Sequence, residues 1–131
     1  MIPLKIMIVE DSATVAHVLK SMLERLGHEV VGIAKSGAQA LRFYDYFTPD
    51  LVTMDVRLPD MDGMAVTEKL LATYPRAQII VVTGVDQQDT VAQAVKAGAK
   101  AYILKPFQID KLRATLDRVM QGMPERVKQA S

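Results

Sequence analysis

The chain has 131 residues, of which 50% are apolar and 24% charged, a composition typical of one globular domain and not of a disordered chain. Its 16 basic and 15 acidic side chains give a net charge of +1, so charge alone would not draw it to nucleic acid or to an anionic membrane. The absence of Cys excludes disulfides, thiolate metal sites and a Cys nucleophile, and no apolar run approaches the roughly 20 residues that span a bilayer. The amino-terminal apolar segment is too short for a signal peptide, so we expect a cytoplasmic protein.

Five short apolar runs, bounded by turn-forming residues, predict five β-strands. Runs of this kind are typical of strands that are buried on both faces of a parallel sheet. They cover residues 4–9, 30–34, 51–54, 78–83 and 101–104.

Apolar residues spaced by three and four positions predict a helix after each strand. Capping side chains, and Gly or Pro where a helix ends, indicate the boundaries. The helices are expected from the Asp11-Ser12 cap to about Gly27, from Ser36-Gly37 to residue 47, over residues 64–73, from the Asp89-Thr90 cap to Gly98, and from about Ile109 to Gln121. Val18 lies on the apolar stripe of the first helix and is expected to face inward. We expect His17, off that stripe, and His28, in the following turn, to be solvated surface residues.

Five strands that alternate with five helices predict an α/β fold, in which a five-stranded parallel sheet carries helices on both faces. This is the doubly wound (βα)5 arrangement. The flavodoxin-like strand order 2-1-3-4-5 is taken from known folds with this pattern, because local periodicity leaves the order open. Residues 1–122 are expected to form one domain, and residues 123–131, which are polar and charged, a flexible C-terminal tail or the start of a linker.

Polar side chains follow four of the five predicted strands. Glu10 and Asp11 follow the first, Asp55 the third, Thr83 the fourth and Lys105 the fifth. Parallel strands end at one edge of a sheet, so these groups are expected to meet there if the first and third strands are neighbours. Taken alone, Asp55 could equally be a solvated loop residue, and Lys105 could simply pair with an acid. Neither reading accounts for four strand ends at once.

Three clustered carboxylates repel one another unless a cation neutralises them. Mg²⁺ fits this need, because it binds one or two carboxylates, keeps several waters and shares its other positions with phosphate oxygens. We expect Asp11 and Asp55 to bind Mg²⁺ directly, Glu10 to bind it directly or through water, and a backbone carbonyl just after Asp55, at Arg57, to complete the protein's share. Mn²⁺ is expected to be able to substitute for Mg²⁺.

An ionised Asp55 beside such a cation can attack phosphorus as a carboxylate nucleophile. Thr83 and Lys105 would then bind oxygens of the transferred group. A calcium loop at residues 60–63 is rejected, because that register places Leu58 at the first ligand position and Lys69 where a bidentate Glu is needed.

The acidic pair at residues 10–11, the run Met-Asp-Val-Arg-Leu-Pro-Asp-Met-Asp-Gly at 54–63, Val-Val-Thr-Gly at 81–84 and Leu-Lys-Pro-Phe at 104–107 make a specific set. Over roughly residues 4–121 the chain resembles the receiver domain of two-component response regulators, especially single-domain chemotaxis-type regulators. The resemblance implies that Asp55 accepts a phosphoryl group, with Mg²⁺, from the phosphohistidine of a histidine kinase or phosphotransfer protein. It also implies later hydrolysis and a cis bond between Lys105 and Pro106. Such a protein is not a conventional enzyme, although it catalyses its own phosphorylation and dephosphorylation.

The resemblance further implies a switch that couples Thr83 to Tyr102, through which phosphorylation changes the face read by a downstream protein target. That face consists of the fourth helix, the fifth strand and the fifth helix. Glu10 stands where the family often has Asp, which should move the metal slightly outward. Arg57 and Val85 occupy variable positions and are expected to tune the phosphoryl lifetime. We expect no nucleic-acid or membrane partner, and a monomer or weak dimer.

Two other functions remain open from the residues. One is a small phosphatase with an aspartyl intermediate, similar to haloacid-dehalogenase-like enzymes. Those enzymes need their nucleophile after the first strand and a second Asp two residues later, where this chain has Arg57. The other is a constitutive docking module that merely retains the site.

Overall fold

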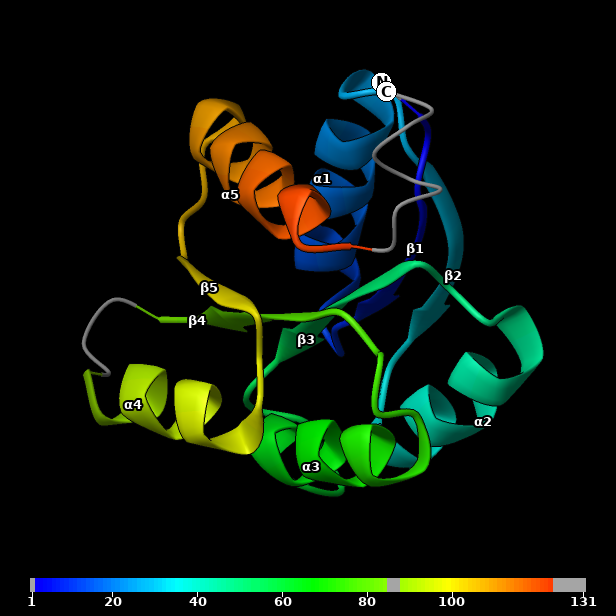
Figure 1. Cartoon of the computed structure of the whole chain (residues 1–131), viewed down its shortest axis with the longest axis vertical. Helices are drawn as coiled ribbons and strands as arrows, with labels where there is room; N and C mark the ends of the chain where they lie inside the picture. The colour runs from blue at the N-terminus through cyan, green and yellow to red at the C-terminus, as the bar shows by residue number, and fades with distance from the viewer. Residues whose placement is uncertain (1, 85–87, 124–131) are drawn as a thin grey trace.

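A computed structural model of the chain describes residues 2–84 and 88–123, so Val85 and residues 124–131 of the predicted tail lie outside the described residues. Its strands form one parallel sheet in the order β2-β1-β3-β4-β5 (Figure 1). This confirms the predicted α/β fold and its strand order. The elements are β1 (Lys5–Val9), α1 (Ala13–Arg25), β2 (Glu29–Ala34), α2 (Gly37–Phe47), β3 (Leu51–Asp55), α3 (Gly63–Thr73), β4 (Ile79–Thr83), α4 (Gln88–Ala97), β5 (Ala101–Leu104) and α5 (Ile109–Gln121).

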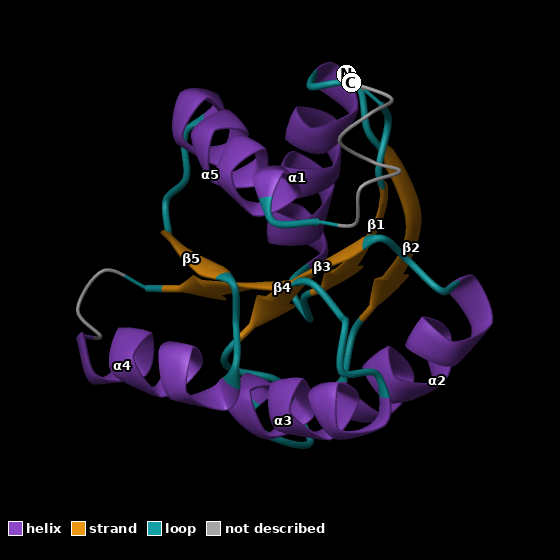
Figure 2. Ribbon diagram, viewed as in Figure 1, coloured by secondary structure: helices purple, strands orange, loops and turns teal. Residues whose placement is uncertain are grey.

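The sheet lies between two layers of helices. α1 and α5 cover one face, and α2, α3 and α4 cover the other (Figure 2). Successive side chains of a strand point to opposite faces, so β1 sends Ile6 and Ile8 to the α1 and α5 side, and Met7 and Val9 to the α2 and α3 side. All residues of the central strands β3 and β4 are buried, which explains why these strands appear as continuous apolar runs.

Local chemistry sets most helix boundaries. The Ser12 hydroxyl accepts a hydrogen bond from the Val15 N–H at 3.3 Å and caps α1. Gly98, with φ of 103°, follows α4 in the left-handed conformation that ends many helices. However, α4 begins at Gln88, so the predicted Asp89-Thr90 cap lies inside the first turn. A carboxylate is also stabilised there, because the first turn carries the positive end of the helix dipole.

The prediction that His28 is a solvated surface residue is wrong. Its side chain is buried, and its Nδ1 accepts a hydrogen bond from the Leu4 N–H at 3.0 Å. Burial lowers the pKa of His28, although the negative charge of Asp117 opposes this. The physical reason is that the turn after α1 packs beside the start of β1, where the buried Leu4 N–H needs an acceptor. His17 is exposed, as predicted.

Two apolar residues also differ from expectation. Val18 was expected to face inward but is 43% exposed and lines a groove with Pro106 and Phe107. Ala16 is buried in its place, which shifts the inward stripe of α1 toward the smaller side chain. Met123, at the start of the predicted tail, is 4% exposed and packs in the cluster formed by α1 and α5. Within residues 2–84 and 88–123, no helix has the length and apolar content needed to cross a membrane.

Candidate functional site

The ends of four strands meet at one edge of the sheet. Asp55, the last residue of β3, pairs in register with Val82, and Thr83, the last residue of β4, pairs with Leu104. In β1, Val9 pairs with Met54, so Glu10 follows beside Asp55. The structure thus brings the predicted strand-end residues to one edge, because parallel strands end together.

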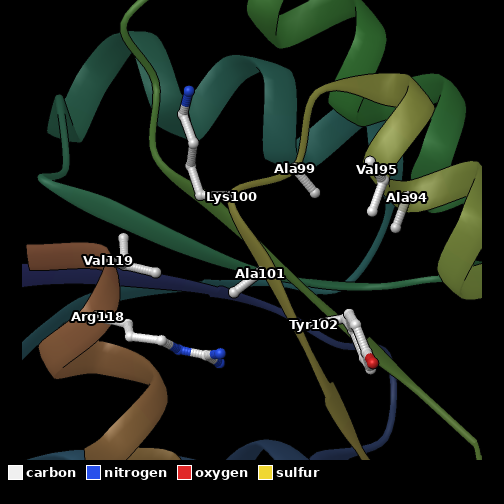
Figure 3. A pocket seen from close by; sticks show the side chains of 8 residues that line it. All are labelled: Ala94, Val95, Ala99, Lys100, Ala101, Tyr102, Arg118 and Val119. Carbon is white, nitrogen blue, oxygen red and sulfur yellow. The ribbon is translucent and has the colours of Figure 1, made fainter. Parts of the chain in front are cut away.

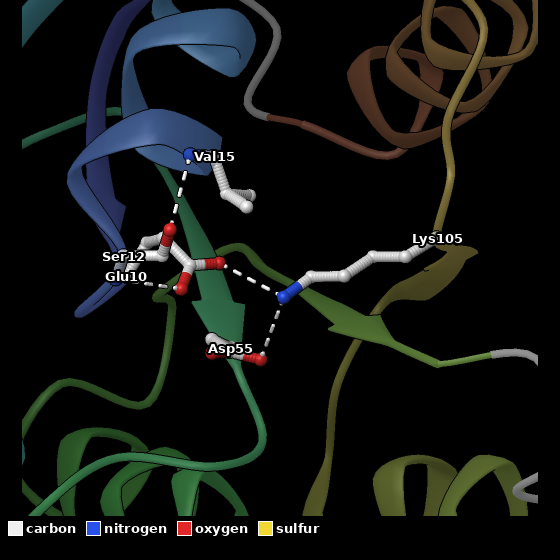
Figure 4. A network of polar contacts seen from close by, with 5 residues as sticks. All are labelled: Glu10, Ser12, Val15, Asp55 and Lys105. Atoms are coloured by element: carbon white, nitrogen blue, oxygen red, sulfur yellow. Dashed lines mark hydrogen bonds and ion pairs between the residues drawn. The ribbon is translucent and has the colours of Figure 1, made fainter.

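The Lys105 ammonium joins two of the predicted acids. Its Nζ lies 3.0 Å from Glu10 Oε1 and 3.3 Å from Asp55 Oδ1 (Figure 4). Glu10 is 4% exposed and Asp55 is 7% exposed, so both carboxylates are largely shielded from water. The other oxygen of Glu10 accepts a hydrogen bond from the Ser12 N–H at 3.1 Å. Charge-assisted hydrogen bonds therefore hold these side chains in place.

The cluster keeps an excess of negative charge. Burial raises the pKa of Glu10, against the opposing effect of its hydrogen bonds with Lys105 and the Ser12 N–H, and the charge of Asp55 adds to the rise. Burial alone would lower the pKa of Lys105, but the hydrogen bond with Glu10 and the charges of Asp55 and Glu10 outweigh it, so the pKa is raised and the lysine stays charged. One ammonium cannot balance three ionised carboxylates. The site is therefore suited to a further cation.

Glu10, Asp11 and Asp55 could hold that cation. Each offers a carboxylate oxygen, and these oxygens lie within 4.8 Å of one another. Glu10 and Asp55 are buried, whereas Asp11 is exposed, so the cluster has a solvent-facing side. A set made only of oxygen donors suits a hard divalent ion such as Mg²⁺.

The start of α3, just after the loop that follows Asp55, contributes a residue whose role the sequence analysis missed. A Cβ atom placed on Gly63 would collide with the backbone carbonyl oxygen of Asp55, so only Gly fits. The Gly63 N–H also donates a hydrogen bond of 2.7 Å to the Val56 carbonyl. Gly63 ends the motif at residues 54–63, but nothing in the local sequence indicates a close approach to Asp55. Arg57, the predicted carbonyl ligand, lies in this loop and forms an isolated bridge with Asp62.

The two predicted switch residues lie on neighbouring strands. Thr83 is buried, and its carbonyl accepts a hydrogen bond from the Lys105 N–H at 2.7 Å. Tyr102 is 42% exposed and pairs in register with Val81, two residues before Thr83. Because residues two apart share a face of a strand, Thr83 and Tyr102 lie on the same side of the sheet. The predicted cis bond between Lys105 and Pro106 is confirmed.

Comparison with known proteins gives a consistent result. The response regulator receiver domain matches residues 6–117 of the chain. The chemotaxis protein CheY of Bacillus subtilis is 39% identical over 116 residues, which cover 88% of this chain and 97% of CheY.

Solved structures agree with this result. The crystal structure of a putative response regulator from Chloroflexus aurantiacus superposes with a TM-score of 0.85 and 29% identity. The match covers 90% of this chain and 98% of the other. CheY in a CheX-CheY-BeF3-Mg²⁺ complex from Borrelia burgdorferi superposes with a TM-score of 0.84 and 27% identity, covering 90% of each chain. With its acidic cluster at the edge where the parallel strands end, the chain belongs to the family of response regulator receiver domains.

Proposed function

We propose that this receiver accepts a phosphoryl group on Asp55 from the phosphohistidine of a histidine kinase or phosphotransfer protein. The observation that carries the proposal is the position of the Asp55 carboxylate, shielded from water, 3.3 Å from Lys105 Nζ and grouped with two further acids. The Borrelia CheY complex, which contains BeF3 and Mg²⁺, supports it.

The acids have distinct roles toward Mg²⁺. Asp11 and Asp55 would hold the ion directly, Glu10 directly or through water, and Arg57 through its backbone carbonyl. Both oxygens of Glu10 already accept hydrogen bonds, from Lys105 and from the Ser12 N–H. Bound Mg²⁺ would offset the negative charge of the acids and of the incoming phosphate, and Mn²⁺ would serve the same purpose.

In the transfer step, an Asp55 oxygen forms a bond to phosphorus while the bond from phosphorus to the histidine nitrogen breaks, and the imidazole leaves. Lys105 binds an oxygen of the transferred group, which its ammonium can do because it already lies beside Asp55. Thr83 binds another. Hydrolysis by water later releases phosphate and restores the carboxylate.

The output face consists of α4, β5 and α5. Val95, Tyr102 and Leu104 on this face are 65%, 42% and 43% exposed, and exposed apolar side chains grouped on one face are typical of protein interaction surfaces. A pocket of about 330 Å³ lies between Val95 and Tyr102 on one side and Arg118 of α5 on the other (Figure 3). We infer that movement of Thr83 toward the phosphoryl group and rotation of Tyr102 alter this face for a downstream protein target. The protein would act in the cytoplasm as a monomer or weak dimer, without nucleic-acid or membrane contacts.

Incubation with acetyl phosphate and Mg²⁺, followed by intact mass measurement, tests the proposal. A transient adduct of about 80 Da that is absent in Asp55→Asn is the expected result. Removal of the metal with a chelator should suppress it. Turnover of external phosphate esters would instead indicate a phosphatase, and neither adduct nor turnover would indicate a docking module.

A further inference from the structure

The loop between β3 and α3, residues 56–62, is attached at its tip to a different helix. Asp60 Oδ1 accepts a hydrogen bond of 2.7 Å from the Gly37 N–H, and Asp60 Oδ2 accepts one of 2.9 Å from the Ala38 N–H. These donors lie in the first turn of α2, 22 and 23 residues before Asp60. One exposed carboxylate therefore joins two elements that are distant in sequence.

α2 also has a cap from its own N-terminal residue. The Ser36 hydroxyl accepts a hydrogen bond from the Gln39 N–H at 3.1 Å and already caps the helix. Asp60 satisfies the two remaining N–H groups of the first turn. The backbone hydrogen bonds from Gly37 and Ala38 also lower the pKa of Asp60, so the carboxylate stays ionised at neutral pH.

The base of the same loop has local contacts of its own. The Gly63 N–H donates to the Val56 carbonyl at 2.7 Å, and Arg57 forms a bridge with Asp62. Asp62 Oδ1 accepts a hydrogen bond from the Met64 N–H at 2.7 Å and caps α3. At the tip, residues 58–61, Leu58 and Met61 pack against the apolar cluster beneath the loop, and Asp60 supplies the hydrogen bonds with α2.

The start of α2 is itself tied to the acidic cluster. The Glu10 N–H donates a hydrogen bond of 2.9 Å to the carbonyl of Ala34, the last residue of β2. Contacts therefore run from Glu10 through the end of β2 and the start of α2 to Asp60, and from there along the loop back to Asp55. A movement of the loop tip would change the position of the Arg57 backbone relative to the acids.

We propose that Asp60 is a positioning residue for the metal site: by binding the start of α2, it fixes the loop that carries the Arg57 carbonyl and so increases the affinity for Mg²⁺. The inference rests on the proposed function, because that function assigns the Arg57 carbonyl to the metal. Loss of supporting contacts around metal ligands typically lowers affinity about 10–100-fold. Asp60 acts through the backbone, so we expect the lower end, about tenfold.

The test compares Asp60→Ala and Asp60→Asn with a matched control, Asp50→Ala. Asp50 also uses its carboxylate to bind a backbone N–H, that of Lys5 at 2.9 Å, but it precedes β3 at the other end of the strand. Mg²⁺ binding is measured by isothermal titration calorimetry, and unfolding by urea. The rate of labelling by acetyl phosphate is then measured as a function of Mg²⁺ concentration.

We expect Asp60→Ala to raise the Mg²⁺ dissociation constant about tenfold, and to raise the Mg²⁺ concentration for half-maximal labelling by the same factor, with little change in the maximal rate. Asp60→Asn keeps one acceptor oxygen and should show a smaller loss of Mg²⁺ affinity. This variant provides the test if Asp60→Ala does not fold. Asp50→Ala should leave Mg²⁺ affinity unchanged.

Unchanged Mg²⁺ affinity in folded Asp60 variants would overturn the inference. An equal loss of affinity in Asp50→Ala would also overturn it, because the effect would then follow from general destabilisation. Failure of the proposed function gives a different result: the unmodified protein would bind Mg²⁺ normally but take no phosphoryl group on Asp55.

Discussion

Replacement of Lys105 by Met tests whether this lysine holds the acidic cluster together. Met keeps much of the apolar stem of the side chain but removes the ammonium. Glu10 and Asp55 would then face each other without the positive charge that lies 3.0 and 3.3 Å from them. We expect the free energy of unfolding to fall when metal is absent.

The magnitude follows from distance and burial. At an effective dielectric constant of about 20, unit charges at these separations attract by about 5 kcal/mol, and most of this is offset by the cost of removing the groups from water. Loss of one partner from a buried pair costs about 3–5 kcal/mol. The Lys105 side chain is 28% exposed, so solvent weakens the pair, and we expect a loss of about 2–3 kcal/mol near neutral pH.

The loss should depend on pH. Burial already raises the pKa of Glu10 above its ordinary value of 4.5, and removal of the ammonium will raise it further. A raised pKa means that the folded chain binds the proton more readily than the unfolded chain, so stability is lost as the pH rises through the folded-state pKa. The difference between the two proteins should therefore be small at pH 4.5 and should grow as the pH rises.

Urea unfolding of both proteins at pH 5 and pH 8, with chelator and then with Mg²⁺, measures these effects. Mg²⁺ should restore part of the lost stability at pH 8, because the cation replaces the missing positive charge. Lys69→Met, at an exposed position on α3, is the control and should change little. An equal loss for Lys105→Met at both pH values would refute the reasoning, since it would show that the lost interaction does not involve an ionised carboxylate.

Two further changes test other parts of the structure. Because the pKa of His28 is lowered in the folded chain, its stabilising effect is complete above about pH 6.5 and is lost as the pH falls toward the folded-state pKa. His28→Asn keeps an acceptor for the Leu4 N–H but does not titrate, so it should remove this pH dependence from the free energy of unfolding measured in urea. His17→Asn, at an exposed position, should leave it unchanged, and a pH profile unaffected by His28→Asn would contradict the argument. Gly63→Ala should lower the free energy of unfolding by about 1–3 kcal/mol, because its Cβ would collide with the Asp55 carbonyl. Gly122→Ala, whose Cβ would lie 3.6 Å from the nearest atom, is the matched control, and an equal cost in both would count against the close approach.

The alternation of strands and helices could be predicted because each element carries its own local pattern. Strands buried on both faces are continuous apolar runs, and the Ser12 and Ser36 caps precede amphipathic helices. The meeting of Asp55 and Lys105 also followed from sequence, since parallel strands end at one edge. The strand order did not, because it depends on which strands pair across long connections.

Three features that sequence analysis missed depend on contacts outside their own helix, strand or turn. His28 is buried because the Leu4 N–H, 24 residues earlier, donates to it. Gly63 is required by the Asp55 carbonyl, which lies on the other side of the intervening loop. Asp60 was considered only within the rejected calcium loop and the motif at residues 54–63, and its hydrogen bonds to the start of α2 span more than twenty residues. No periodicity or local motif reports contacts of this kind.

The two contacts of Lys105 connect the stability of the cluster to its proposed chemistry. The shorter contact, at 3.0 Å, is to Glu10, and the longer, at 3.3 Å, is to the proposed nucleophile Asp55. A phosphoryl group on Asp55 would offer new oxygens close to the ammonium, which could bind them while it keeps Glu10 as a partner. Glu10 would then serve as the fixed support of Lys105 as well as an acid of the metal site. Because the same lysine stabilises the fold, a loss of labelling in a Lys105 variant can be assigned to the transfer step only under conditions where urea unfolding shows that the variant is fully folded.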